Sequence, residues 1–157
     1  MDNDLTLTRV YPDPHDVYDR SPFADSEDFD SDWWGDHNVV YLGSEDDLLY
    51  RADDSTGREV ARILVIQEDM PIANSYGVPD MPDGYLEIKF FEVAASARRR
   101  GVGSRAAQLL RQEFPDQPLV AFSEGGDCFW STLPGWNRFE NRESPGNQLL
   151  FVSLPVR

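Results

Sequence analysis

The sequence predicts a mixed α/β protein with a mostly antiparallel central sheet and helices on both faces. Two observations predict this class. The segment Tyr85–Val93 carries apolar side chains on both of its faces, which is typical of a central strand that is covered on both sides. An amphipathic helix at Val102–Phe114 connects it to a second apolar strand at Pro118–Ser123, and a strand–helix–strand unit of this kind places its two strands parallel.

The first part of the chain holds one strand and a poorly periodic region. Alternation of apolar and polar residues predicts a strand at Leu5–Val10. Asp13-Pro14 has the pattern of a helix N-cap followed by proline at the first helical position, which predicts a short helix through Tyr18. Residues 25–36 mix acidic and aromatic side chains and are expected to form helix and loop. Val39–Leu42 is either another strand or the buried end of the preceding helix.

A β-hairpin and a long loop precede the central strand. Asp47–Asp53 and Arg58–Gln67 flank the turn sequence Asp-Ser-Thr-Gly and are expected to pair as antiparallel strands. Glu68–Gly84 contains three prolines and no usable period. Loops of this length in compact domains are usually functional or mobile.

The last part of the chain returns to short elements. An apolar stripe at helical spacing, formed by Val102, Ala106, Leu109 and Leu110, is expected to be the buried face of the helix after the central strand. Gly126–Leu133 is predicted as a short helix capped by Asp127, with Cys128 as a small buried residue. Gly135–Glu140 and Asn147–Leu154 are predicted as a final antiparallel pair.

The charge of the chain is strongly negative and uneven. The formal net charge is -15, and residues 1–60 hold 17 acidic residues against 4 arginines. A field of that sign repels phosphate backbones, which argues against a nucleic-acid partner, and it attracts cations. The alternative is that the acidity serves only to keep the protein soluble.

Cysteine content and hydropathy argue against several other classes. A single cysteine rules out an internal disulfide and suits a reducing compartment. One cysteine and two histidines argue against a Cys/His zinc site, so no metal is expected. The chain has no apolar run near 18 residues and no signal-peptide pattern at its start. We therefore expect a cytoplasmic protein without a membrane partner.

Three consecutive arginines, Arg98–Arg100, run into Gly101-Val102-Gly103 at the start of a predicted helix. Such a loop can bind phosphate, because glycines let backbone amides approach an anion and a helix N-terminus carries partial positive charge. A Walker A loop is excluded, since no Lys-Ser/Thr pair follows the second glycine. A dinucleotide fingerprint with Glu124 as the ribose-binding acid also fits on paper, but its first glycine should end the strand directly, and here residues 94–100 intervene.

The same stretch resembles the cofactor loop of the GNAT superfamily of N-acetyltransferases. Those enzymes carry Arg or Gln, any two residues, Gly, any residue, and Gly or Ala, five residues after an apolar residue that ends the central strand. Here Val93 ends the strand, and the run from Arg98 to Gly103 matches at every spacing. The predicted order of elements is also similar, and the resemblance implies a splayed parallel pair of strands. Its motif-bearing core is Tyr85–Phe114, whereas the N-terminal third is similar in element order only.

The resemblance implies a single GNAT-like acetyltransferase domain over residues 1–157. The acidic helical and loop region at roughly residues 12–38 would bind substrate, and roughly residues 85–123 would form the cofactor-binding core. The implied enzyme moves an acetyl group from acetyl-CoA to a primary amine of a cationic small molecule or protein. Similar proteins commonly form dimers, so a homodimer is also considered.

Acetyl-CoA is the cofactor that the resemblance implies. The amides of the loop would bind its pyrophosphate and the arginines its phosphates, while the end of the central strand would pair with the pantetheine arm and a tryptophan would pack against that arm. The implied cofactor-binding residues are Phe91, Val93, Arg98, Arg99, Arg100, Gly101, Val102, Gly103, Ser104 and Trp130. One or two of the three arginines are expected to contact phosphate, and Arg98 or Arg99 is expected to tie the loop to the sheet instead.

Acetyl transfer to an amine needs a general base, because an ammonium group has no lone pair. Glu87 lies eleven residues before Arg98, where lysine-modifying members of the superfamily carry a catalytic glutamate in a similar strand. It is otherwise only a polar strand position paired with Lys89. Glu92, which points to the opposite face by the period of two, is the alternative base.

The resemblance also implies an acid for the leaving thiolate, which is commonly a tyrosine four residues before a Gly-Phe pair. This sequence has Gly135-Trp136 at that place. The aligned residue is Ser131, or Trp130 if Pro134 is an insertion. Ser131 is therefore the candidate donor, although a serine hydroxyl is a poor acid.

Three residues of the acidic region are candidates for the acceptor site, namely Asp32, Trp33 and Trp34, because carboxylates and ring faces both attract a cation. The alternative is a solvated acidic loop whose aromatic residues fold into the core. Two rival functions also stay open. One is a non-catalytic module that holds acyl-CoA or a partner on the same scaffold, and the other is an acidic interaction protein.

Overall fold

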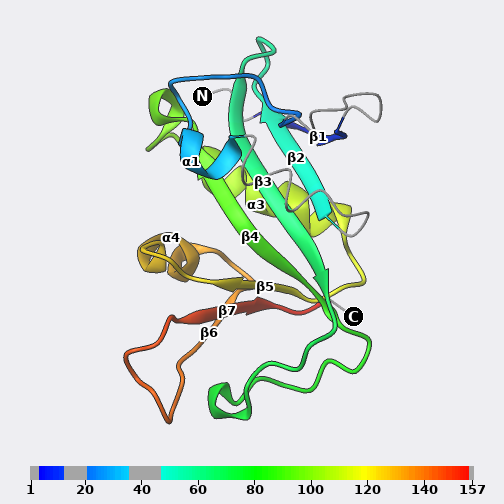
Figure 1. Ribbon diagram of the computed structural model, residues 1–157, viewed down its shortest axis with the longest axis vertical. Helices are drawn as coiled ribbons and strands as arrows, with labels where there is room; N and C mark the ends of the chain where they lie inside the picture. Colours follow the sequence, from blue (N-terminus) through cyan, green and yellow to red (C-terminus); the bar gives the residue numbers. More distant parts are fainter. Residues whose placement is uncertain (1–3, 13–20, 36–46, 156–157) are drawn as a thin grey trace. The chain divides into compact units, whose positions relative to one another are not determined.

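The computed structural model describes residues 4–12, 21–35 and 47–155, and its strands have the predicted order (Figure 1). Within these residues the strands form a seven-stranded sheet in the order β1-β2-β3-β4-β5-β7-β6. Their bounds are β1 Thr6–Val10, β2 Asp47–Asp53, β3 Glu59–Glu68, β4 Tyr85–Val93, β5 Leu119–Phe122, β6 Asn137–Phe139 and β7 Leu150–Ser153.

The helices are short except for one. Their bounds are α1 Ser31–Trp34, α3 Val102–Glu113 and α4 Asp127–Thr132, with 3-10 turns η1 at Asn74–Tyr76 and η2 at Ala95–Ala97. The mixed α/β class with a mostly antiparallel sheet is confirmed. The helix predicted to run through Tyr18 and the segment Val39–Leu42 lie outside the described residues. None of the helices in the described ranges has the length and apolar character that a membrane span requires.

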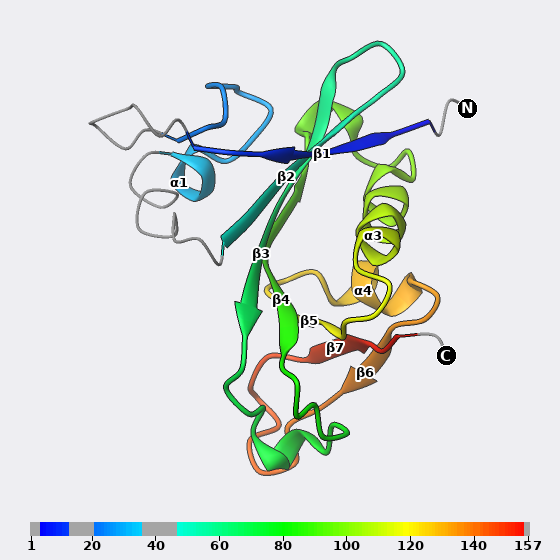
Figure 2. The same ribbon diagram turned by 90° about the vertical axis from the view of Figure 1, so that its right-hand side faces the viewer.

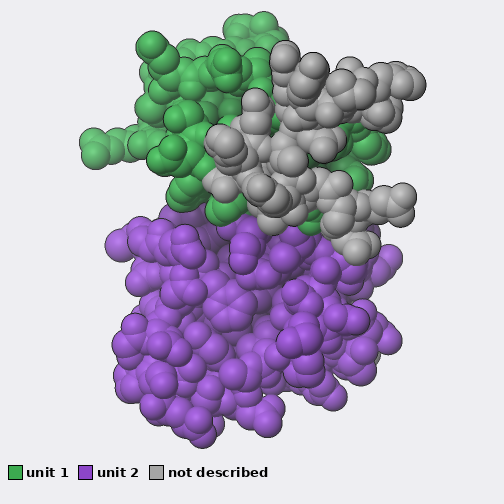
Figure 3. Space-filling view, in the orientation of Figure 1, with its two compact units in different colours: residues 1–65, 90–110 green, residues 66–89, 111–157 purple. Residues whose placement is uncertain are grey.

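The chain divides into two compact units (Figure 3). Unit 1 comprises residues 1–65 and 90–110, and unit 2 comprises residues 66–89 and 111–157. Strands β3 and β4 each pass from one unit into the other, so that each unit is made from separate stretches of the sequence.

Unit 1 holds the most continuously buried strand. Helices α1 and α3 lie on opposite sides of its sheet (Figure 2), and the whole of Val60–Val65 in β3 is no more than 3% exposed. This explains why the sequence of β3 shows no alternation of apolar and polar residues. The turn before it is closed by Asp54, whose Oδ1 accepts hydrogen bonds from the amides of Thr56 and Arg58 at 2.9 and 3.1 Å.

One buried arginine fastens the N-terminal segment to this strand. Arg62 is only 2% exposed, and its guanidinium lies over the rings of Phe29 and Phe23, at 4.1 and 4.8 Å from their centroids. It donates to the carbonyl of Ala24 and to Glu59 Oε1, both at 2.8 Å. Residues 23–29 therefore pack through a paired and stacked cation rather than through apolar contacts alone.

Unit 2 is built around the predicted parallel pair. Leu86 of β4 pairs with Leu119 of β5, and Glu87 pairs with Val120. Strand β7 then runs antiparallel to both β5 and β6, which confirms the predicted final pair. The core on one face of these strands is a cluster of buried residues, namely Tyr76, Tyr85, Val120, Leu150 and Val152.

Two tyrosines of that core hold the loop between β3 and β4. The hydroxyl of Tyr76 donates to the carbonyl of Gln148, and that of Tyr85 donates to the carbonyl of Met70, both at 2.9 Å. A buried tyrosine whose hydroxyl reaches a backbone carbonyl fixes the chain at that point. The long loop predicted from the three prolines is therefore an ordered segment with one 3-10 turn.

Two predictions about α4 are wrong. Asp127 is the first residue of the helix and not its cap, because the chain turns one residue earlier at Gly126, which makes no side-chain capping bond. Cys128 is exposed rather than buried. The helix buries Trp130, and residues two positions apart lie on different sides of a helix, so Cys128 faces away from the buried side.

We expect Arg62→Ala to lower the free energy of unfolding by about 3–5 kcal/mol, because it leaves Glu59 in a sheltered position without its partner. Arg51→Ala is the matched control, since the Arg51–Asp53 pair is more exposed, with side chains that are 37% and 22% accessible. The control should cost no more than about 1 kcal/mol. Urea unfolding of both variants measures the difference, and equal losses would contradict the role given to Arg62.

Candidate functional site

Backbone hydrogen bonds fix the start of the loop between β4 and α3, and the loop then makes a turn through two left-handed residues. The amide of Ala94 donates to the carbonyl of Val60 at 2.8 Å, and that of Ala95 donates to the carbonyl of Asp28 at 2.9 Å. After η2 the backbone enters the left-handed region twice, at Arg99 with φ 63° and at Gly101 with φ 77°. Glycine takes this conformation without strain, whereas a residue with a Cβ does not, so the turn is strained at Arg99.

Helix α3 begins directly after this turn, at Val102. The first four N–H groups of any helix have no partner inside it, and they carry the positive end of the helix dipole. A Cβ at Gly101 would meet no atom within 4 Å, so the space beside this residue is open. The loop from Arg98 to Ser104 thus has the properties of an anion cradle.

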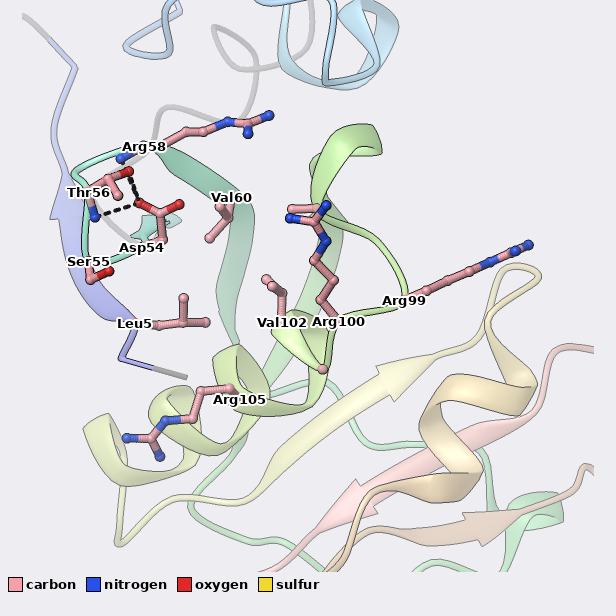
Figure 4. Close-up of a pocket in the computed structure, with 12 residues that line it drawn as sticks. Leu5, Asp54, Ser55, Thr56, Arg58, Val60, Arg99, Arg100, Val102 and Arg105 are labelled. Atoms are coloured by element: carbon pink, nitrogen blue, oxygen red, sulfur yellow. Dashed lines mark hydrogen bonds between the residues drawn. The ribbon is translucent and has the colours of Figure 1, made fainter. Parts of the chain in front are cut away.

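The three consecutive arginines take different directions. Arg98 donates from Nε to the carbonyl of Val93 at 3.2 Å, and its guanidinium lies 3.7 Å from the carboxylate of Glu92, so that it ties the loop to β4. Arg99 is exposed and extends away from the neighbouring side chains, while Arg100 stands over a pocket (Figure 4). Arg105, one turn into α3, donates to Gln108 Oε1 at 2.9 Å.

The pocket is a hollow of about 550 Å³ in unit 1. Its apolar lining includes Leu5, Val60 and Val102. Its charged lining comprises four arginines and one carboxylate, namely Arg58, Arg99, Arg100, Arg105 and Asp54 (Figure 4). An apolar floor beside several arginines suits a ligand that joins a flat apolar group to phosphate. Sequence reasoning missed Arg58 because it comes from the hairpin turn, far from the loop in sequence.

A second network that sequence reasoning missed joins the loop to the N-terminal segment. Ser96 in η2 donates to Asp28 Oδ2 at 2.7 Å, and Arg58 donates to the same oxygen at 3.1 Å. The hydrogen bond from Ser96, and then that from Arg58, holds the pKa of Asp28 below its ordinary value. Asp28 therefore stays ionised, and its hydrogen bond from Ser96 holds the N-terminal segment against the start of the loop between β4 and α3.

The two candidate general bases lie in different settings. The carboxylate of Glu92 is 11% exposed and accepts hydrogen bonds from the amide of Asp30 and from Trp34 Nε1, both at 2.9 Å. These hydrogen bonds occupy the carboxylate with donors from the N-terminal segment, and the guanidinium of Arg98 lies 3.7 Å from it. Glu92 is therefore a structural residue of unit 1.

Glu87 lies in unit 2 and is half-buried. Burial raises the pKa of its carboxyl, the nearby Lys89 lowers it, and Glu68 raises it further. Burial also raises the pKa of the neighbouring Tyr85 to about 12, with further contributions from Glu68, Glu87 and Asp69, so that this hydroxyl keeps its proton. A carboxyl with a raised pKa is suited to accept a proton near neutral pH.

The residues aligned with the usual tyrosine do not form a buried donor. Ser131 is exposed. Trp130 is 7% exposed and packs against Phe129, Trp136 and Phe151, at centroid distances of 5.0, 5.0 and 6.4 Å. Trp130 is thus a core residue of unit 2.

The aromatic candidates of the acidic segment are largely packed. Trp34 is 3% exposed, and the ring of Trp33 stacks on Phe90 at 5.3 Å. Asp32 is exposed at the start of α1, where its amide donates to the capping side chain of Asp30. Trp34 therefore occupies the core, which is the alternative that the sequence left open, while Asp32 is exposed and Trp33 is partly exposed.

The candidate residues are divided between the two units. Unit 1 holds the strand end, the loop and the acidic segment, comprising Phe91, Val93, Arg98–Ser104, Asp32, Trp33 and Trp34. Unit 2 holds Glu87, Trp130 and Ser131. Phe91 and Val93 are half-buried residues at the carboxyl end of β4, where the strand runs into the loop.

No protein-family model and no curated protein matches the chain, but solved structures do. The Bacillus subtilis N-acetyltransferase YlbP, solved in complex with coenzyme A, has a TM-score of 0.61 at 15% identity over 97% of each chain. AtaTR bound with acetyl-CoA has a TM-score of 0.60 at 14% identity, over 95% of this chain and 93% of that one. The ribosomal-protein-S18-alanine N-acetyltransferase from Escherichia coli has a TM-score of 0.57 at 12% identity, over 98% of this chain and 96% of that one. At these identities the similarity shows a shared fold.

We expect Glu92→Ala to lower the free energy of unfolding by about 2–3 kcal/mol, because the Asp30 amide and the Trp34 indole lose a charged acceptor. Glu87→Ala is the matched control on the same strand. It removes a carboxylate whose ionisation burial already disfavours, so it should cost much less. Chemical denaturation of the two variants measures both, and a larger loss in the control would reverse the two assignments.

Proposed function

We propose that this chain, which has the GNAT acetyltransferase fold, is an acetyl-CoA-dependent N-acetyltransferase. The observation that carries the proposal is the loop from Arg98 to Ser104. It follows the central strand, turns through a left-handed glycine and presents the N-terminus of α3. Neighbours of this fold were solved with coenzyme A or acetyl-CoA, and the loop residues fit a pyrophosphate.

The cofactor would be held by backbone groups first and by arginines second. The amides from Arg99 to Ser104 bind the pyrophosphate, and the backbone of Phe91 and Val93 pairs with the pantetheine arm. Arg100 supplies charge for the phosphates, and Arg99 has its guanidinium in solvent and is available for the same task. Arg98 contributes indirectly, because its contacts with Val93 and Glu92 set the position of the loop.

Acetyl-CoA supplies an acetyl group activated as a thioester. The chain contributes the proton transfer, because the acceptor amine must lose a proton to become a nucleophile. Glu87 is the general base, and its half-buried position keeps the basicity of its carboxylate high. The nearby positive charge of Lys89 lowers the pKa of Glu87 and so opposes part of the increase that burial causes.

The proposed acceptor is a primary amine that carries a positive charge. The acidic segment supports this, since Asp32 is exposed beside the partly accessible ring of Trp33, and the chain carries a net charge of -15. Such a field raises the local concentration of cations and repels polyanions. A small polyamine, an aminoglycoside-like compound and a protein amine all satisfy this chemistry.

One observation favours a second candidate function. Ser131 is exposed, so the position aligned with the usual acid offers no buried proton donor. A domain that binds acyl-CoA without turnover would have no need of one. Thiol release measured against a panel of amines separates the two functions, because the binding module predicts cofactor binding with no turnover on any amine.

We expect saturating acetyl-CoA to raise the melting temperature by several degrees, since a ligand at 100 times its dissociation constant adds about 2.7 kcal/mol of stability. Gly101→Ala should lose most of this shift. Gly57→Ala is the matched control, because Gly57 also has positive φ and open space around it but lies in the hairpin turn. Both variants should lose about 1–2 kcal/mol of intrinsic stability from backbone strain. Thermal melts with and without cofactor test this, and an undiminished shift in Gly101→Ala would exclude the loop as the binding site.

We expect Glu87→Gln to lower kcat by about 100-fold or more, as for loss of a general base. In the native protein, activity should rise with pH through the raised pKa of Glu87, because the carboxylate is the active form. Lys89→Met should move this acid limb to higher pH by removing a charge that lowers the pKa, and Glu68→Gln should move it to lower pH. Rate profiles between pH 5 and pH 9 measure the position of the acid limb in each protein. If the limb stays at the same pH in both variants as in the native protein, the titrating group is not Glu87.

A further inference from the structure

The pocket of unit 1 gathers positive charge in a chain whose net charge is -15. Four arginines and one carboxylate line it. Arg58 is paired with Asp28 at 3.1 Å, but among the described residues Arg99, Arg100 and Arg105 form no ion pair. Cations gathered in one place repel one another. An anion bound in the pocket would relieve this repulsion.

Two of these arginines are suited to bind the anion. Arg100 stands over the pocket from the loop, and Arg105 lines it from the first turn of α3 (Figure 4). Arg105 uses Nη1 in a hydrogen bond to Gln108 Oε1 at 2.9 Å, and a guanidinium has further N–H donors. A guanidinium binds phosphate through two parallel N–H donors. The pair therefore suits a phosphate monoester, which carries about two negative charges near pH 7.

One hydrogen-bond acceptor lies among these donors. Asp54 Oδ1 accepts from the hydroxyl and the amide of Thr56, at 2.6 and 2.9 Å, and from the amide of Arg58 at 3.1 Å. The Thr56 hydroxyl, and then the Arg58 amide, hold the pKa of Asp54 below its ordinary value. Within the described part of the chain all of these bonds reach Oδ1, which leaves Oδ2 to accept from a ligand. The pocket thus suits a ligand that brings a hydroxyl or amino donor as well as a phosphate.

The apolar lining of the pocket indicates a ring. Val60 and Ala97 are each 3% exposed, and Leu5 and Val102 are partly exposed beside them. The hollow of about 550 Å³ falls within the roughly 300–1,000 Å³ of small-molecule sites. A bare phosphate would leave the apolar side chains in contact with water, whereas a purine ring would cover them.

We propose that this pocket binds a nucleoside phosphate. Arg100 and Arg105 hold its phosphate monoester, and a hydroxyl or amino group of the ligand donates to Asp54. Its ring covers Val60 and Val102. Two ligands have this chemistry, namely the 3′-phosphoadenosine end of the acetyl donor and a separate nucleotide. The first rests on the proposed acetyltransferase function, and the second does not.

Calorimetry with adenosine 3′,5′-bisphosphate tests the site. We expect the native chain to bind it and Arg105→Met to weaken binding about tenfold or more, as for loss of a hydrogen bond to a charged group. Arg105→Lys keeps the charge and should retain part of the affinity. Arg138→Met is the matched control, because Arg138 is an exposed arginine of β6 outside the pocket, and it should bind as the native chain does. All three variants should melt like the native chain without ligand.

Coenzyme A and dephospho-coenzyme A, which lacks the 3′-phosphate, distinguish the two sources. If the pocket holds the end of the acetyl donor, Arg105→Met weakens coenzyme A by the same factor and leaves dephospho-coenzyme A unchanged. If it holds a separate nucleotide, adenosine 3′,5′-bisphosphate binds equally well when coenzyme A is saturating.

Two results would overturn the inference. One is a native chain that does not bind adenosine 3′,5′-bisphosphate, and the other is an Arg105→Met variant that binds it as tightly as the native chain does. If coenzyme A still binds in either case, the proposed function stands without this pocket. A chain that binds the bisphosphate through Arg105 but does not bind coenzyme A would keep the pocket and lose the proposed function.

Discussion

The carboxylate of Glu92 is the point at which three parts of unit 1 are joined. It accepts hydrogen bonds from the Asp30 amide and the Trp34 indole, and it lies 3.7 Å from the guanidinium of Arg98. Burying a carboxylate without a partner raises the free energy of the folded state. The three contacts of Glu92 therefore stabilise the fold of unit 1. Its partners belong to the segment proposed for the acceptor and to the loop proposed for the cofactor. The end of β4 therefore positions both segments through one side chain.

Two glutamates of β4 illustrate how the environment divides one residue type into two roles. Glu87 and Glu92 are five positions apart, an odd spacing that sends them to opposite faces of the strand. Glu92 meets fixed N–H donors and becomes part of the scaffold. Glu87 is half-buried, and burial raises the pKa of its carboxyl against the opposing effect of Lys89. The carboxyl with fewer fixed donors is the one that is suited to move a proton.

The chain holds 14 basic residues against 29 acidic ones, and the structure uses its arginines for distinct tasks. Arg62 is buried between two aromatic rings, and Arg98 ties the loop to the strand. Arg58, Arg100 and Arg105 line the pocket beside α3. Positive charge is thus concentrated at a candidate anion site, in a chain whose net charge of -15 repels polyanions. This separation explains how a strongly acidic protein can keep a site for a phosphate-bearing cofactor.

The sequence by itself determined the elements and the loop, because hydrophobic period, glycine and proline act over a few neighbouring residues. The bounds of β4, the parallel neighbour β5 and the turn into α3 all follow from such local signals. The tertiary structure alone decided which polar groups are satisfied, since that depends on partners distant in sequence. It paired Glu92 with residues about sixty positions away, exposed Cys128 and Ser131, and buried Ser123 without a partner. No local pattern distinguishes these three small side chains, because burial and hydrogen bonding are set by the elements packed around them.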